Sequence, residues 1–513
     1  MTKRNSHFKS GTAVRSNPAF WLGGVAILVW AWSGAWFNPS QLNDSWEQLV
    51  WAQSLEWGYW KHPPLTTWLM AVLHRYWGPS AIWPYALGGL CAVLTLYGVY
   101  RLALLLLPAS CIGWVVLLFT LNNGFTRRAQ VFNHNSVLVA LMALLAWRLA
   151  AALHSGRMKD WAWVGALAGM GLITKYQAIM PISFMGLMVV LMWGFANPRP
   201  FPQVWMGQTL PAQSHSQRPS WAGLGLAFAI SVLICLPHVQ WLVHNNWLPM
   251  RYADQSLQGQ HVSAWRDALS LFVLQLRNWT PALLLLLAYG VGWRVLRGPT
   301  SSQWIASHPW WWALIWGPAL GLIGLAAVGV SLQSHWGMQA LQFLVLPIAV
   351  WAASRWGEPK RWAWVSWGVV QLAGLCLMAM EMTGTIRAEH PDVRKLQARH
   401  IVLNAMDHWQ EATPCPLIRV EAPSHLGGMM LAHSQPVTPW ALIQVSEDGD
   451  PMKSPWAEPS DVSRTGVLRL SMGEAAPTGG DWQLIWKPVQ DWPAYQVWAQ
   501  VIPPTQGCGT GGQ

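Results

Sequence analysis

Two acidic residues stand just beyond a membrane-length apolar run near the start of the chain. Asp44 and Glu47 follow the run that ends at residue 37, and Lys61 and His62 lie directly ahead of a Pro-Pro pair. A carboxylate in such a place can act as a general base that takes a proton from an attacking hydroxyl or amine. The pattern predicts a catalytic loop at a membrane surface, although Asp44 would also suit a helix cap or a solvated loop.

Further polar loops lie at the ends of apolar segments, and most of them carry cations. These loops are NNGFTRRAQVFNHN (122–135), TKYQ (174–177), HNNWLPMRYADQS (244–256) and SHWGMQ (334–339). Guanidinium and ammonium groups pair strongly with phosphate oxygens, so the loops predict one cavity that holds an anionic lipid phosphate. The candidate cations are Lys175, Arg127, Arg128 and Arg251, with Lys61 or His62. Each of them, taken alone, is also explained as a side chain that snorkels to the lipid interface.

The same loops supply candidates for the walls of a substrate cavity. These are Tyr59, Asn133, Asn135, Asn245, Arg251 and His335. Several loops also carry histidine, but no H-x-x-E-H or similar ligand spacing appears. A divalent metal is therefore possible but has little support in the sequence, and no residue is predicted to be a metal ligand. No other cofactor is predicted.

The segments that must position these loops read as membrane helices. Of the 513 residues, 53% are hydrophobic and 10% are charged, against about 25% charged in soluble proteins. Eleven transmembrane helices are expected, near 19–37, 81–107, 110–122, 134–153, 160–174, 177–196, 221–242, 280–297, 310–330, 338–355 and 361–380. Residues 64–77 and 265–279 are predicted to be interfacial helices outside these spans. The expected fold class is an all-α polytopic membrane protein.

Charge predicts how these spans are oriented. The N-terminal MTKRNSHFKSGTAVR is basic and lacks a small-residue cleavage site, so an uncleaved first span with a cytoplasmic start is expected. The net charge of +11 comes from short inward loops, which follows the positive-inside pattern and speaks against nucleic-acid binding. All the polar loops above then face outward, as does the tail.

The tail from residue 381 to 513 is predicted to be a separate outward α+β domain, after a membrane domain of residues 1–380. CPLIRVEA, GVLRLSM and DWQLIWKPV are expected to be its short strands. Cys415 and Cys508 lie in this tail, and the sequence leaves open whether they form a disulfide in an oxidising compartment.

The outward loops resemble those of family 39-type membrane glycosyltransferases, which include protein mannosyltransferases, aminoarabinose transferases that modify lipid A, and rhizobial lipopolysaccharide sugar transferases. DSWEQLVWAQSLEWGYWKHPPLTTWL is similar to their first outward loop. RRAQVFNHNSVLVALMALLAW, GLITKYQAIM and PHVQWLVHNNWLPMRY are similar to later segments of these enzymes, in the same order.

The resemblance implies the GT-C fold and an inverting transferase that uses a polyprenyl-phosphate-linked sugar. Its catalytic acid would be Asp44, and Lys175 with Tyr176 would hold the donor phosphate near Arg127, Arg128 and His62. Expected partners are membrane lipids and an envelope acceptor, such as lipid A, lipopolysaccharide or protein, on the periplasmic side of a bacterial inner membrane.

The chain departs from the family pattern at three places. Ser45 replaces the acid after Asp44, and the second acid stands at Glu47. His62 stands where many members have lysine, and Asn133 or Asn135 where many have aspartate. Asp44 and Glu47 are thus the candidate bases.

Two other functions fit part of the pattern. A transporter or flippase of lipid-linked sugars would bind the same phosphate without transfer chemistry, but it usually carries charges or breaks deep in its spans and internal repeats. A scaffold anchored by its spans would not need eleven of them. The identities of the sugar and the acceptor stay open.

Overall fold

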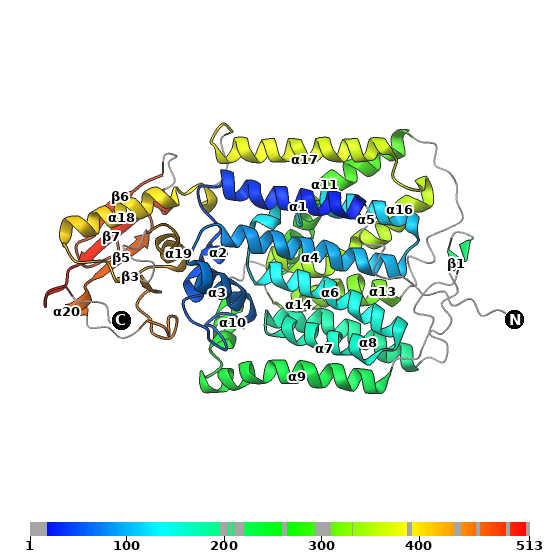
Figure 1. Ribbon diagram of the computed structural model, residues 1–513, viewed down its shortest axis with the longest axis horizontal. Helices are drawn as coiled ribbons and strands as arrows, with labels where there is room; N and C mark the ends of the chain where they lie inside the picture. The colour runs from blue at the N-terminus through cyan, green and yellow to red at the C-terminus, as the bar shows by residue number, and fades with distance from the viewer. Residues whose placement is uncertain are drawn as a thin grey trace.

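The computed structural model describes residues 18–194, 204–205, 208–209, 220–258, 264–292, 309–330, 332–386, 392–434, 443–457, 462–488 and 493–508. A helical bundle fills one part of the molecule, and a small domain with a β-sheet lies against one end of it (Figure 1). The basic N-terminal stretch and the ends of several predicted inward loops lie outside the described residues.

The bundle is built from helices that run roughly along its long axis (Figure 1). They are α1 (Pro18–Phe37), α4 (Trp83–Leu106), α5 (Ala109–Leu121), α6 (His134–Ser155), α7 (Met158–Leu172), α8 (Ile179–Gly194), α9 (Trp221–His244), α11 (Ala264–Gly292), α13 (Pro309–Trp311), α14 (Gly317–Ala327), α15 (Met338–Leu341), α16 (Val345–Trp356) and α17 (Arg361–Met382). A short π-helical turn, Trp312–Trp316, joins α13 to α14. Within the described residues, each of the eleven predicted spans contains helix.

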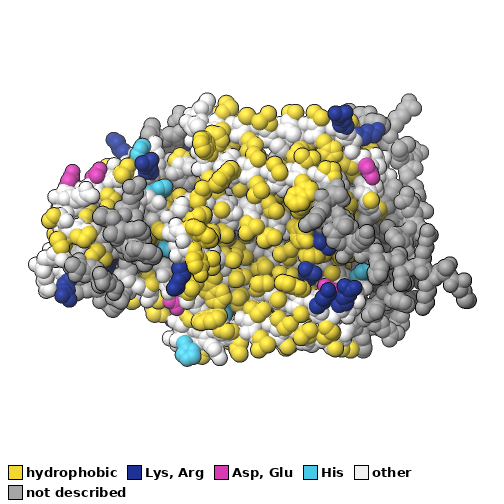
Figure 2. Space-filling view, in the orientation of Figure 1, with side chains coloured by type: hydrophobic (Ala, Val, Ile, Leu, Met, Phe, Trp, Pro, Cys, Tyr) yellow, Lys and Arg dark blue, Asp and Glu magenta, His cyan; other side chains and the backbone are white. Residues whose placement is uncertain are grey.

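Seven helices among the described residues are long and apolar enough to cross a membrane, with two shorter apolar helices beside them. On the face that Figure 2 shows, apolar side chains cover the middle of the bundle, and charged side chains lie toward its two ends. The chain is therefore a multi-pass membrane protein, because such a belt is stable only against hydrocarbon.

One predicted boundary is wrong. Residues 265–279 are not a separate interfacial helix, because they continue through Pro281 into the following span as one helix, α11. Exposed apolar side chains recur at helical spacing across the proline, at Leu269, Val273, Leu276, Leu284 and Leu287. This stripe forms one lipid-facing surface, which favours one helix over two.

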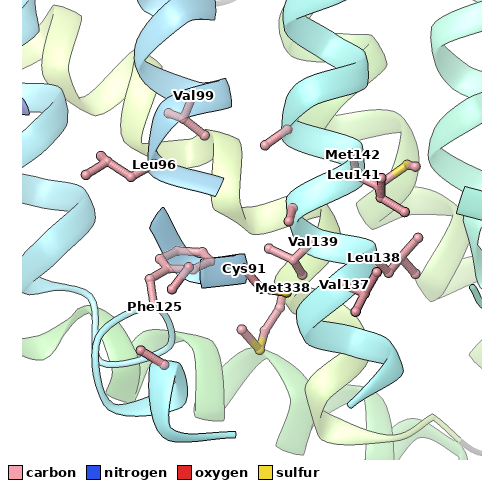
Figure 3. Close-up of a cluster of buried hydrophobic side chains, with 14 of the residues drawn as sticks. Cys91, Leu96, Val99, Phe125, Val137, Leu138, Val139, Leu141, Met142 and Met338 are labelled. Carbon is pink, nitrogen blue, oxygen red and sulfur yellow. The ribbon is translucent and has the colours of Figure 1, made fainter. Parts of the chain in front are cut away.

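The interior of the bundle is close-packed around α6. Gly98 on α4 lets the two helices approach closely, since a Cβ there would lie 2.6 Å from the backbone carbon of Ala143. Side chains of α4 and α6 meet with Phe125 and Met338 in one buried cluster (Figure 3). Packing of this density holds the ends of α6 in fixed positions.

Three short helices lie at the end of the bundle that faces the sheet domain (Figure 1). They are α2 (Asn43–Trp51), α3 (Leu65–Trp77) and α10 (Leu248–Gln258). As expected for residues 64–77, α3 is a separate amphipathic helix. It buries Thr66, Thr67 and Met70 and exposes Val72 and Trp77.

The C-terminal domain contains helices α18 (Ala398–Ala412), α19 (Ser424–His433) and α20 (Val462–Thr465) and a five-stranded sheet. The strand order is β4 (Gln444–Ser446), β3 (Arg419–Glu421), β5 (Val467–Met472), β7 (Val497–Ile502) and β6 (Gln483–Trp486). β3 runs parallel to β4 and β5, and β7 runs antiparallel to β5 and β6. The three predicted strands are confirmed as β3, β5 and β6, and Cys415 and Cys508 form a disulfide.

Candidate functional site

A cavity of about 480 Å³ lies at the end of the bundle beside α2 and α10. Its walls come from α2, the turn before α3, the start of α6, the α7–α8 connection, α10 and the segment before α15. The lining residues are Asp44, Glu47, Lys61, His62, Asn133, His134, Asn135, Lys175, Tyr176, Gln177, Ile179, Met180, Tyr252, Ala253, Leu325, Gln333 and Trp336. Loops far apart in the sequence thus converge on one space, as the sequence predicted.

Asp44 is held at the start of α2 by the first residues of α6. The side-chain amide of Asn133 donates to Oδ2 of Asp44 at 2.9 Å. The oxygen of the same amide accepts from the backbone N–H groups of Asn135 and Ser136, which caps α6. Because the cap fixes which way the amide faces, its NH₂ group must point toward Asp44.

Lys175 lies in the α7–α8 connection, where its Nζ donates to Oδ1 of Asn135 at 2.8 Å. Burial lowers the pKa of Lys175 to about 8, and the charge of Asp44 partly offsets this. Within the described residues, no carboxylate lies in ion-pair contact with this ammonium. The site therefore holds a buried cation that an anionic ligand would stabilise.

Arg128 lies close behind this pair. It lines a small adjoining cavity of about 30 Å³ together with Asn133 and Asn135. Burial lowers the pKa of Arg128, and the charge of Asp44 opposes that shift. Its guanidinium adds positive charge near the same carboxylate.

Glu47 connects the cavity to the C-terminal domain. Nζ of Lys61 lies 2.5 Å from Oε1 of Glu47, and the hydroxyl of Ser424 lies 3.5 Å from the same oxygen. Ser424 also donates to Glu447, whose Oε1 accepts from Nε1 of Trp51 at 3.2 Å. Burial raises the pKa of Glu47 to about 7, since the pairing with Lys61 only partly offsets it while Glu447 raises it further.

Aromatic rings pack against one another in and behind the cavity wall. The ring centroids of His62 and His134 lie 4.1 Å apart, and the ring centroid of Trp51 lies 6.0 Å from that of His134. Tyr59 stacks on Trp51 at 5.3 Å, so it supports the wall without lining it. The hydroxyl of Tyr176 lies 3.0 Å from Nε2 of His238.

The structure brings most of the predicted residues together. Those that line the cavity are Asp44, Glu47, Lys61, His62, Asn133, Asn135, Lys175 and Tyr176. Arg127 instead pairs with Glu381 at 2.8 Å, Asn245 donates to the backbone of Trp241, and Arg251 is exposed. The side chain of His335 lies outside the described residues.

Several lining residues did not stand out in the sequence. His134, Gln177, Tyr252 and Trp336 lie inside the loops that were singled out, so inspection of each whole loop would have found them. Ser424 and Glu447 follow α2 by almost four hundred residues, and nothing in their local sequence indicates the contact. Among the described residues, no group of three or more His, Cys, Asp or Glu is placed to hold a metal ion.

Part of the chain matches a known protein family. The model for dolichyl-phosphate-mannose-protein mannosyltransferase matches residues 61–206, a range that includes Lys61, His62, Asn133, Asn135 and Lys175. No curated protein matches the chain.

Two solved structures share the arrangement of the whole chain. ArnT from Cupriavidus metallidurans bound to undecaprenyl phosphate is 13% identical, with a TM-score of 0.57 over 96% of this chain and 98% of the other. ArnT from the same organism in the apo state is 14% identical, with a TM-score of 0.54 over 97% of this chain and all of the other. Identity this low shows the fold alone, and the fold is the one that these two ArnT structures have.

Proposed function

We propose that this chain, a GT-C membrane glycosyltransferase of the family 39 type, transfers a sugar from a polyprenyl-phosphate donor to an envelope acceptor on the outer side of the membrane. The observation that carries the proposal is that one cavity holds both Asp44, a candidate base, and Lys175, a buried cation. The undecaprenyl phosphate bound to ArnT of C. metallidurans supports the choice of donor class.

The reaction would use these groups as follows. Asp44 accepts the proton of the acceptor hydroxyl or amine, which attacks the anomeric carbon of the donor sugar. The bond between that carbon and the phosphate oxygen breaks, with inversion, and polyprenyl phosphate leaves. Lys175, with Arg128 close by, stabilises the negative charge on the leaving phosphate.

Other cavity groups would position the substrates. Tyr176, His62 and Lys61 belong to the donor-phosphate side of this proposal, and Glu47 is the second carboxylate that could take the proton. Acceptors of the proposed class are lipid A, another lipopolysaccharide sugar or a protein hydroxyl, on the periplasmic side of a bacterial inner membrane.

The test compares wild type with Asp44→Asn in detergent, using undecaprenyl-phosphate-linked sugars and a panel of these acceptors. Loss of the base should lower release of free undecaprenyl phosphate by about 10²-fold or more, while donor binding persists. Asp407→Asn, at an exposed position on α18, is the matched control and should keep wild-type turnover.

Equal release by wild type and Asp44→Asn would contradict the role of Asp44 and make Glu47 the next candidate. Donor binding without release by wild type, over the whole panel, would favour the lipid-linked sugar transporter.

A further inference from the structure

The ring of His134 lies in the cavity wall with one of its two nitrogens unpaired. The side chain is only 3% exposed, and the ring hydrogen-bonds to the backbone carbonyl of Pro63. Its Nε2 is buried and has no hydrogen-bond partner among the described residues, so Nδ1 makes the Pro63 bond. A buried polar atom without a partner is costly, which indicates that a ligand supplies the missing bond.

The chemistry of that nitrogen follows from its neighbours. Nδ1 donates its hydrogen to the backbone carbonyl of Pro63. The ring is buried and shares the cavity with the ammonium groups of Lys175 and Lys61, and these surroundings favour a neutral imidazole. Nε2 therefore carries a lone pair and acts as an acceptor. Its partner must be a donor, such as a hydroxyl group.

The position of His134 selects the part of the substrate that it meets. The residue before it, Asn133, bonds to Asp44, and the residue after it, Asn135, bonds to Lys175. In the proposed reaction the donor sugar spans the gap between the base, where the anomeric carbon is attacked, and the cation, where the phosphate sits. His134 itself lines the cavity that holds Asp44 and Lys175, so its ring lies beside the place proposed for the sugar.

The ring is also held rigidly. His62 packs against it at 4.1 Å and Trp51 at 6.0 Å, and both belong to the structure around α2. A nitrogen fixed in this way forms its bond without further ordering of the side chain.

We propose that His134 is a donor-sugar-binding residue, whose Nε2 accepts a hydrogen bond from a hydroxyl of the sugar to be transferred. The proposal rests on the proposed function. It makes His134 a specificity-determining residue, because a sugar without that hydroxyl would leave Nε2 unpaired.

Two substitutions distinguish the role of Nδ1 of His134 from that of Nε2. In His134→Asn the side-chain amide can still donate to Pro63, but nothing replaces Nε2. In His134→Gln the amide oxygen reaches the position of Nε2. The probes are undecaprenyl phosphate, which has no sugar, and undecaprenyl phosphate carrying glucose, mannose or arabinose, with affinities measured in detergent.

Wild type should bind at least one sugar-bearing probe more tightly than undecaprenyl phosphate. His134→Asn should weaken that probe at least fivefold and leave undecaprenyl phosphate within twofold, and His134→Gln should recover most of the loss. Turnover with the same probe should show the change in KM rather than in kcat.

Three results would overturn the proposal: no loss in His134→Asn, equal loss of both kinds of probe, or no preference of wild type for any sugar-bearing probe. Failure of the proposed function is a separate result, because wild type would then release no undecaprenyl phosphate from any donor and acceptor pair.

Discussion

At the scale of single residues, the site separates positive and negative charge by two asparagines. Asn133 holds Asp44 and Asn135 holds Lys175, so the carboxylate and the ammonium lie in one cavity without neutralising each other in a direct ion pair. A direct ion pair would leave neither group available, whereas the amide bridges keep both open to substrate.

Lys175 should make donor binding sensitive to alkali. Its pKa lies near 8 instead of 10.5, so the ammonium is present below about pH 8 and is lost as the pH rises above it. The pKa of about 8 is that of Lys175 in the protein without ligand. Above pH 8, the affinity for undecaprenyl phosphate should therefore fall roughly tenfold per pH unit. Titration of binding between pH 7 and 10 tests this expectation.

Lys175→Arg is the decisive control, since a guanidinium keeps its charge over that range and should remove the alkaline fall. Lys453→Arg, on the C-terminal domain, should leave the profile unchanged. A wild-type affinity that stays flat up to pH 10 would show that Lys175 does not bind the phosphate.

At the scale of elements, α2 connects the membrane bundle to the C-terminal domain. α2 carries Asp44 and Glu47 in the cavity wall and packs against α19, where Gly428 lies against Trp46 and Ser424 lies 3.5 Å from Glu47. A Cβ at Gly428 would lie 2.7 Å from the backbone oxygen of Trp46. The C-terminal domain and the cavity residues of α2 therefore meet at one interface.

Gly428→Ala should push α19 away from α2 and disturb Glu47 through Ser424. We expect turnover to fall at least fivefold and the melting temperature to drop by several degrees. The control is Gly473→Ala, where the nearest atom to the added Cβ is 3.7 Å away. Wild-type turnover in Gly428→Ala would show that α19 does not position α2.

The disulfide between Cys415 and Cys508 should stabilise the C-terminal domain. It joins residues 93 positions apart, and its loss in Cys508→Ser should cost about 2–5 kcal/mol. Limited proteolysis should cut the domain of this variant faster, while Cys376→Ser, which removes an exposed free thiol on α17, should resist like wild type. Equal resistance of all three proteins would contradict a stabilising role.

The sequence predicted the helices and strands better than the contacts between them. Apolar runs indicate helices because burial in lipid demands them locally, and the loops between them carried most of the cavity residues. The continuation of α11 through Pro281 was missed, since a proline is read as a boundary when the packing around it is not known. Glu447 reaches Trp51 only through the docking of the C-terminal domain, and no periodicity in the chain records that contact.

At the scale of the whole molecule, the cavity is lined by α2 and α10, which lie at the end of the bundle that bears the C-terminal domain (Figure 1). α6 starts at this end and finishes at Ser155, at the opposite end, near Arg157. The disulfide supports an oxidising compartment for the C-terminal domain.

We expect the C-terminal domain to lie outside the cytoplasm and the end of α6 at Ser155 to lie on the cytoplasmic side. Reporter fusions in a bacterial host should reveal this orientation. Alkaline phosphatase joined after residue 386 should be active, and the same enzyme joined after residue 156 should be inactive, because it folds only outside the cytoplasm. Green fluorescent protein at the same two junctions should give the opposite pattern. Any reversal would place the cavity on the cytoplasmic side.

The position of β7 in the sheet also constrains how the protein is made. β7 is synthesised after β5 and β6, yet it lies between them and pairs with both. During translation β5 and β6 are made before the strand with which both of them pair. The five-stranded sheet is therefore completed only when synthesis has passed Ile502, after every helix of the bundle has been made.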